Sequence, residues 1–162
     1  MESFRLDLWE AAVGHLHFIQ ENESFSSEGV LRGLHYQIPP YSQAKLVRVI
    51  CGAIRDVVVD MRPESSTFGV YHIEILDEIE KKQLYIPSGF AHGFLTLSAE
   101  AVVLYKVDAP YHPEAERSLR FDDETLQIEW GLSADSCIVS EKDRRALSWN
   151  EAVDELSVVG AQ

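Results

Sequence analysis

The sequence is poor in cysteine and in basic residues, and it has no long apolar run. Its two cysteines, Cys51 and Cys137, lie in a chain that opens with neither the basic region nor the apolar region of a signal peptide. We therefore expect a cytoplasmic protein with free thiols. The longest apolar runs, such as residues 56–60, are too short to span a bilayer, so no membrane partner is expected.

Acidic residues far outnumber basic ones. The chain has 14 lysines and arginines against 27 aspartates and glutamates, which gives a formal net charge of −13. Because nucleic-acid binding relies on basic patches that neutralise phosphates, this balance argues against a nucleic-acid partner. A small anionic ligand remains compatible with it, provided that a few basic residues converge locally.

Length and patterning predict one all-β domain over residues 1–162. The chain is 46% hydrophobic and no linker or repeat divides it. Short alternating or apolar runs between turn residues predict strands at 15–21, 29–37, 44–51, 54–61, 70–76, 82–86, 92–97, 102–107 and 118–121. Many short strands at regular spacing are typical of an antiparallel sandwich or a small jelly-roll barrel.

Both ends of the chain predict short helices. The apolar spacing at residues 6–13, followed by Gly14, predicts one helix. Residues 149–159 predict another, with Ser148 or Asn150 as its N-cap. The sequence leaves two placements open for the second helix, either over the barrel mouth or at a subunit contact.

The segment at residues 29–37 carries a candidate catalytic histidine, His35. A two-residue period places Leu31, Gly33 and Gln37 on its face of the strand and Val30, Arg32, Leu34 and Tyr36 on the other. A histidine beside Gly33 has open space around it, as a site requires. On this pattern alone, two interpretations stand: a catalytic base, or a structural histidine in the core.

Two further side chains point where apolar residues point. Lys45 shares a face with Val47 and Val49, so it is either an edge lysine that reaches water or a buried cation that needs an anionic partner. A lysine of the second kind suits a developing oxyanion. Tyr105 shares a face with neighbouring valines, and a core tyrosine is the simpler interpretation.

Other candidates lie in turns and loops. His92 stands between small residues, which permits close approach of a ligand or another backbone, and Tyr111 follows Pro110 in a loop that can border a pocket. Metal-binding jelly rolls carry a His-x-His pair with a nearby Glu. His35 lacks a second histidine at that spacing, and His15 and His17 lie in the wrong strand context. No metal site is therefore expected.

Several motifs in order resemble one enzyme family. They are GVLRGLHYQ (29–37), QAKLVR (43–48), DVVVD (56–60), TFG (67–69), IPSGFAHGF (86–94) and LYK (104–106). From about Glu2 to Asp143 the chain resembles the dTDP-4-dehydrorhamnose 3,5-epimerases. The resemblance implies a cupin-type jelly roll, a homodimer and no metal or organic cofactor. It also implies a dTDP-linked 4-keto-6-deoxy sugar, dTDP-4-dehydro-6-deoxy-D-glucose, that is epimerised at C3 and C5.

The same resemblance implies catalytic roles. His35 falls at the base that removes a proton next to the ketone, work that suits an imidazole. Asp143 falls at the aspartate that orients this histidine. Lys45 matches the lysine near the ketone oxygen, and Tyr105 matches the acid on the opposite face of the sugar.

Binding roles follow in the same way. The resemblance places Arg32 on the diphosphate, a role that suits a forked guanidinium. Glu2, Gln20 and Asn22 would lie near the nucleotide, with part of such contacts coming from a neighbouring subunit. His92 and Tyr111 would line the sugar pocket.

Two departures from the family pattern bear on specificity. Members carry a further strand-forming segment before the position of Glu2, and it helps to hold the base and the phosphates. Pro110 precedes Tyr111 where many members have a second tyrosine. Three alternatives therefore stand beside the 3,5-epimerase: a single-carbon (3- or 5-) epimerase of a related nucleotide sugar, a non-catalytic sugar-nucleotide-binding cupin, and a metal-dependent cupin oxygenase.

Overall fold

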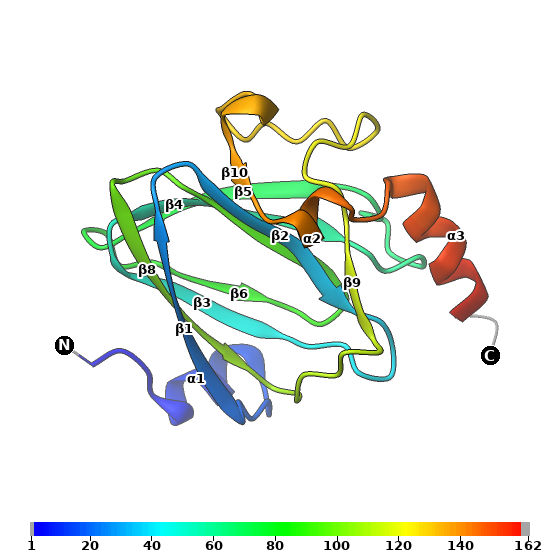
Figure 1. Ribbon diagram of the computed structural model, residues 1–162. Helices are drawn as coiled ribbons and strands as arrows, with labels where there is room; N and C mark the ends of the chain where they lie inside the picture. The colour runs from blue at the N-terminus through cyan, green and yellow to red at the C-terminus, as the bar shows by residue number, and fades with distance from the viewer. Residues whose placement is uncertain (1, 160–162) are drawn as a thin grey trace.

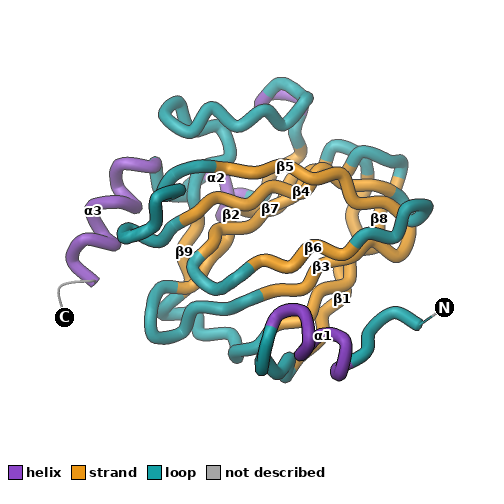
Figure 2. The backbone as a smooth tube through the Cα atoms, turned by 180° about the vertical axis from the view of Figure 1, so that it is seen from behind, coloured by secondary structure: helices purple, strands orange, loops and turns teal. Residues whose placement is uncertain are grey.

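Two sheets, antiparallel except for the parallel pair of β10 and β2, face each other in the computed structural model, which describes residues 2–159 (Figure 1). The first sheet has the order β1 (Gln20–Ser27), β8 (Glu100–Val107), β3 (Lys45–Cys51) and β6 (Gln83–Ile86). The second has the order β10 (Ile138–Val139), β2 (Val30–Gln37), β7 (Phe90–Thr96), β4 (Ala53–Asp60) and β5 (Tyr71–Asp77), and β9 (Glu116–Ser118) also pairs with β2. Figure 2 shows the two sheets on either side of the interior. The predicted all-β jelly roll with short terminal helices is confirmed.

The helices lie at the ends of the chain and in the segment after the strands. The predicted terminal helices form as α1 (Leu6–Val13) and α3 (Trp149–Val159). Sequence patterning did not predict the 3₁₀ turn η1 (Ala134–Ser136) or the one-turn helix α2 (Glu141–Arg144). No helix within residues 2–159 is long and apolar enough to cross a membrane.

The prediction of the first strand was wrong. A strand was expected at residues 15–21, whereas β1 runs over Gln20–Ser27 and pairs with β8 along its whole length. Its sequence, QENESFSS, has almost no apolar residues, so no alternation marks it. Pairing with β8 determines this strand, because local propensity is weak at an exposed edge. The last predicted strand, at 118–121, is likewise displaced to β9.

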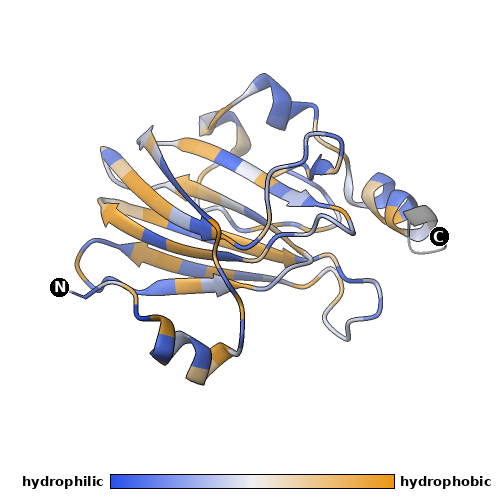
Figure 3. Cartoon of the chain, turned by 90° about the horizontal axis from the view of Figure 1, so that it is seen from below, coloured by the Kyte–Doolittle hydropathy of each residue, from blue (hydrophilic) through white to orange (hydrophobic). Residues whose placement is uncertain are grey.

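The interior between the sheets contains an apolar cluster. Val47 and Val49 of β3 pack there with Val103 of β8 and with side chains from β4 and β7. Alternation along β3 and β8 places Lys45 and Tyr105 on the same inner face, as the sequence predicted. Figure 3 shows that both apolar and polar residues occur along the strands.

A second core covers the outer face of the larger sheet. Val57 and Val59 of β4 belong to it, whereas the intervening Val58 points into the interior cluster. The C-terminal segment supplies the other side of this core, including Ala152 and Leu156 of α3. Helix α3 therefore packs on the back of the sheet rather than over the barrel mouth. Figure 1 shows it beside β9, at the end of the sheet.

Strand β2 does not keep its two-residue period. Leu31 and Leu34 both lie in the outer core, and Arg32 and His35 both line the inner cavity. The register between β2 and β7 shifts between Arg32 and His35. The prediction that Arg32 and His35 occupy opposite faces was therefore wrong. The change of face occurs at Gly33, which has a positive φ of 109°.

A side chain at Gly33 of β2 would clash with the backbone of the neighbouring strand β7. An added Cβ there would lie 2.6 Å from Gly93 Cα and 2.6 Å from the carbonyl oxygen of His92, both of which are backbone atoms. Gly14 also has a positive φ, of 101°, but an added Cβ there meets nothing within 4 Å.

We predict that Gly33→Ala destabilises the protein more than Gly14→Ala does. The strain of a positive φ costs about 1–3 kcal/mol at either position. At Gly33 the clash with β7 adds about 1–3 kcal/mol. Urea unfolding of the two variants measures the difference. Equal losses would show that β2 and β7 can move apart freely.

Candidate active site

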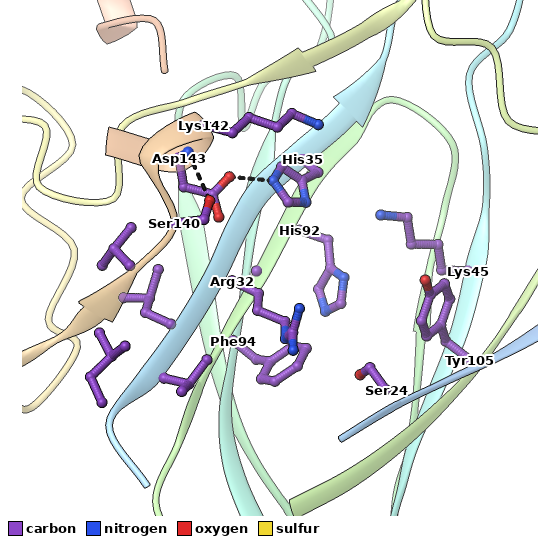
Figure 4. Close-up of a pocket in the computed structure, with 15 residues that line it drawn as sticks. Ser24, Arg32, His35, Lys45, His92, Phe94, Tyr105, Ser140, Lys142 and Asp143 are labelled. Carbon is purple, nitrogen blue, oxygen red and sulfur yellow. Dashed lines mark hydrogen bonds and ion pairs between the residues drawn. The ribbon is translucent and has the colours of Figure 1, made fainter. Parts of the chain in front are cut away.

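A cavity of about 580 Å³ opens between the sheets and adjoins the apolar cluster, with Phe94 common to both. Six of the ten site residues predicted from the sequence line it: Arg32, His35, Lys45, His92, Tyr105 and Asp143. Figure 4 shows their side chains directed toward a common space. Five of them come from strands of the two sheets, and Asp143 comes from α2.

His35 and Asp143 form a hydrogen-bonded pair at the wall of the cavity. His35 Nε2 lies 2.6 Å from Asp143 Oδ1, although 108 residues separate them in sequence. The Asp143 side chain is only 5% exposed. Because Nε2 is engaged with the carboxylate, Nδ1 is the nitrogen left facing the cavity (Figure 4). The pair therefore presents an imidazole nitrogen whose ring orientation is fixed.

The carboxylate of Asp143 is held in its charged form. Burial raises its pKa, but hydrogen bonding and charge from His35, together with the Ser140 hydroxyl and the Gly33 backbone N–H, bring the pKa below its usual value. A charged carboxylate at this place stabilises an imidazolium. The histidine can therefore accept a proton at Nδ1 without leaving an isolated buried charge.

Lys45 and Tyr105 lie on the opposite wall, on neighbouring strands β3 and β8 of the smaller sheet. Burial raises the pKa of the Tyr105 phenol, and the charge of Arg32 opposes this rise. The hydroxyl therefore carries its proton at neutral pH. Since His35 stands on the larger sheet, the cavity holds a proton acceptor on one side and a proton donor on the other.

The pKa of the Lys45 amine lies closer to neutrality than that of an ordinary lysine. Burial lowers its pKa to about 8, against the opposing effects of the negative charges of Asp56 and Glu116. The lysine is thus a cation over the neutral range, in a place where water screens its charge poorly.

A second histidine–aspartate pair has its histidine in the cavity wall and its aspartate buried behind it. His92 Nε2 is 2.8 Å from Asp56 Oδ2, and the Asp56 side chain is completely buried. Its other oxygen, Oδ1, has no hydrogen-bond partner within residues 2–159. Patterning did not single out Asp56. The available signal was its spacing. Asp56 lies two residues from Ile54 and two from Val58, so a carboxylate shares the inward face of a mostly apolar strand.

Arg32 keeps its charge available. Its guanidinium donates to Ser26 Oγ at 2.9 Å and to the carbonyl oxygen of Phe25 at 3.0 Å. No carboxylate among residues 2–159 forms an ion pair with it. Both acceptors are neutral, so the positive charge at the cavity is not compensated locally.

The other four predicted residues lie outside the cavity. Gln20 and Asn22 are hydrogen-bonded to each other at 2.7 Å on β1, and Glu2 is exposed near the N-terminus. Tyr111 is 54% exposed and donates to Glu116 at 2.8 Å. Glu116 in turn accepts from Lys142, which does line the cavity. Tyr111 therefore reaches the site only through this rim network.

Sequence reasoning missed two contributors from the segment after the strands, Ser140 and Lys142. Both line the cavity and both flank Asp143 in the stretch SEKD. The signal was a serine three residues before an acidic residue, which is typical of a helix N-terminus. No group of three or more His, Cys, Asp or Glu side chains that could hold a metal ion occurs within residues 2–159.

Comparison with known proteins identifies the family of this site. The model of a family described as dTDP-4-dehydrorhamnose 3,5-epimerase matches residues 1–151. The dTDP-4-dehydrorhamnose 3,5-epimerase of Shigella flexneri is 46% identical over 144 residues, which cover 88% of this chain and 78% of that protein.

Solved structures agree with the sequence matches. A dTDP-6-deoxy-D-glucose-3,5-epimerase from Legionella pneumophila, in complex with dTDP-4-keto-L-rhamnose, superposes with a TM-score of 0.90 at 45% identity. The match covers 96% of this chain and 82% of that one. A 3′-monoepimerase from Streptomyces bikiniensis, in complex with dTDP-quinovose, gives a TM-score of 0.87 at 33% identity, over 97% and 79% of the chains.

We predict that the Lys45 amine titrates at about pH 8 and that Asp56→Asn lowers its pKa further. The Asp56 carboxylate raises this pKa, so its loss favours the neutral amine. Glu116→Gln removes the second opposing charge and should lower the pKa by less. NMR titration of ε-labelled lysine measures all three values. An unchanged pKa in Asp56→Asn would contradict the assignment.

Proposed function

This chain belongs to the dTDP-4-dehydrorhamnose 3,5-epimerase family, and we propose that it epimerises dTDP-4-dehydro-6-deoxy-D-glucose at C3 and C5 to give dTDP-4-dehydro-L-rhamnose. One observation supports the mechanism above all others. A carboxylate-paired imidazole and a protonated phenol face one cavity from opposite sheets, with an amine beside the phenol.

His35 is the base of each half-reaction. The protons on C3 and C5 are acidic because both carbons flank the C4 ketone, and removal of either proton leaves an enolate. Nδ1 of His35 takes the proton, and the C–H electron pair moves into the enolate. Asp143, at 2.6 Å from Nε2, stabilises the imidazolium that forms.

Lys45 and Tyr105 complete the proton transfer. The ammonium of Lys45 stabilises the negative charge that develops on the C4 oxygen, an effect that is strong where water is excluded. The Tyr105 hydroxyl then delivers a proton to the same carbon from the opposite face, which inverts it. A proton from solvent restores the phenol, and His35 releases its own proton before the second carbon reacts.

The nucleotide part of the substrate meets a small set of charged and polar groups. Arg32 binds the diphosphate through its uncompensated guanidinium. His92 lies against the sugar, with its ring fixed by Asp56. Glu2, Gln20 and Asn22 lie outside the cavity, where an extended nucleotide would pass, and Tyr111 borders the rim.

The working form is a homodimer of the single domain over residues 1–162. Strand β1 supports this proposal, because it is an edge strand of its sheet and carries the exposed Gln20 and Phe25. A partner subunit that adds contacts along this edge would enclose the nucleotide. A nucleotide sugar carries charged phosphates and does not cross a bilayer unaided, so the enzyme acts in the cytoplasm with its substrate.

The runner-up is a single-carbon epimerase of a related nucleotide sugar. The likeness to the 3′-monoepimerase of Streptomyces bikiniensis favours it, since that fold and the present one are closely similar. Both enzymes need a base and an acid, so the count of inverted carbons depends on how the sugar can turn within the cavity. A sugar-nucleotide-binding protein without catalysis has no need of the base, the acid and the amine together.

Deuterium exchange distinguishes these functions. We predict that incubation with the dTDP-4-keto-6-deoxy sugar in deuterated water labels both C3 and C5, as followed by proton NMR. Label at one carbon alone would establish the single-carbon epimerase. Tight binding without label at either carbon would exclude an epimerase acting on this substrate.

We predict that His35→Ala lowers the exchange rate at both carbons by about 10²–10⁴-fold, the usual contribution of a general base. Nucleotide binding measured by calorimetry should be largely retained, since the diphosphate contacts lie elsewhere. His72→Ala is the matched control, because His72 is exposed on β5 and does not line the cavity. Comparable losses in both variants would mean that His35 is not the base.

Tyr105→Phe should separate exchange from inversion. His35 can still remove a proton and return a deuteron to the same face, so we predict label with retention of configuration. Epimerised product should fall by about 10²–10⁴-fold, because the opposite face lacks its donor. NMR coupling constants of the recovered sugar distinguish the two products. Inversion at the wild-type rate would assign the acid to another group.

A further inference from the structure

The position of Asp143 depends on a very short element. Helix α2 is four residues long, and Asp143 is its third residue. A single helical turn has little stability of its own, because helix nucleation costs more than one turn returns. The direction of the Asp143 carboxylate must therefore be set by what holds the ends of this turn.

Ser140 holds the N-terminal end. It is the N-cap of α2, with extended backbone angles (φ −65°, ψ 153°), and its Oγ accepts a hydrogen bond from the Asp143 backbone N–H at 3.1 Å. The Ser140 hydroxyl also contributes to the lowered pKa of the Asp143 carboxyl. One side chain thus caps the backbone of the residue that orients the base and lowers the pKa of its carboxyl.

The chain before Ser140 is anchored to the strand that carries the base. Ser140 directly follows β10, whose Ile138 and Val139 pair with Val30 and Leu31 of β2. The cap therefore joins an element registered on β2 to the turn that carries Asp143. Figure 4 shows Ser140 and Asp143 together beside His35.

On the basis of the proposed function, we infer that Ser140 is a positioning residue that aims Asp143 at His35 Nε2. It acts through Asp143 and takes no part in proton transfer itself. Without the cap, the turn samples orientations in which the carboxylate misses the imidazole. The nitrogen that should accept the proton is then no longer fixed in direction.

The chain offers a matched control. Ser148 is a second serine cap, at the start of α3, with its Oγ 3.4 Å from the Glu151 backbone N–H and 2.7 Å from Glu151 Oε2. Helix α3 packs on the outer face of the larger sheet, and none of its side chains over residues 149–157 lines the cavity. Ser148→Ala therefore removes a cap of the same chemistry without touching the site.

We predict that Ser140→Ala lowers kcat about tenfold, the kinetic equivalent of a lost cap, with KM changed less than about twofold. Ser140→Thr keeps the hydroxyl and should restore kcat to within about twofold of the wild type. Ser148→Ala should lower the thermal midpoint by about 2–4 °C, as expected for a lost cap, and leave kcat unchanged. Equal losses of kcat in Ser140→Ala and Ser148→Ala would overturn the inference.

Two further measurements test the route through Asp143. In an Asp143→Ala background, Ser140→Ala should have no additional effect on kcat, because the group it positions is absent. The short His35–Asp143 hydrogen bond should give a far-downfield proton resonance that Ser140→Ala weakens and Ser140→Thr retains. This resonance needs no substrate, so it tests the positioning role even if the proposed reaction fails. A full additional loss in the double variant, or an unchanged resonance in Ser140→Ala, would contradict it.

Discussion

The close approach of β2 and β7 at Gly33 and Gly93 is the constraint on which the site depends. No side chain fits between the two backbones there, and β2 changes face as it passes this point. Arg32 and His35 are turned into the same cavity for this reason, while Leu31 and Leu34 enter the outer core. The outer edge of β2 is paired with β10 on one side of Gly33 and with β9 beyond it, which leaves the Gly33 N–H to the Asp143 carboxylate. The irregularity at Gly33 therefore positions three groups of the proposed mechanism: the base His35, its partner Asp143, and Arg32, which binds the diphosphate.

The sequence predicted the regular half of the site and failed at the irregular half. Lys45 and Tyr105 lie in stretches of β3 and β8 that keep a two-residue period, residues 45–49 and 103–107, so their inward direction followed from the neighbouring valines. The same rule failed for Arg32, because periodicity carries no information about a change of face at a glycine. It could not find Asp143 either, since the 108 residues between His35 and Asp143 obey no spacing rule. Only the family resemblance supplied that pair, and the resemblance in turn gave no account of Ser140, whose part depends on the three-dimensional turn of α2.

Two histidine–aspartate pairs share the cavity, and their surroundings differ. His35 is partly open to the cavity, and its aspartate comes from a short turn outside the sheets. His92 is buried, and Asp56 lies on the adjacent strand of the same sheet, where the backbone ladder holds it rigidly. The orientation of Asp143, which lies on a turn, depends on the cap of that turn, whereas the position of Asp56 within the sheet is fixed by strand register. The negative charge of Asp56 also raises the pKa of the Lys45 amine, which opposes the lowering effect of burial.

A protein with a large negative net charge can still bind an anionic ligand in a cavity that contains cations. A formal charge of −13 would repel a nucleotide sugar if the charge were evenly spread, yet solvent screens surface charges beyond about 10 Å. Inside the cavity the balance differs, because Arg32 and Lys45 are cations there and neither has a carboxylate as an ion-pair partner within residues 2–159. Lys142 stands at the rim, where Glu116 takes up part of its charge. A few cations in a poorly screened space outweigh many carboxylates in water. The acidic surface is therefore compatible with an anionic ligand in the cavity.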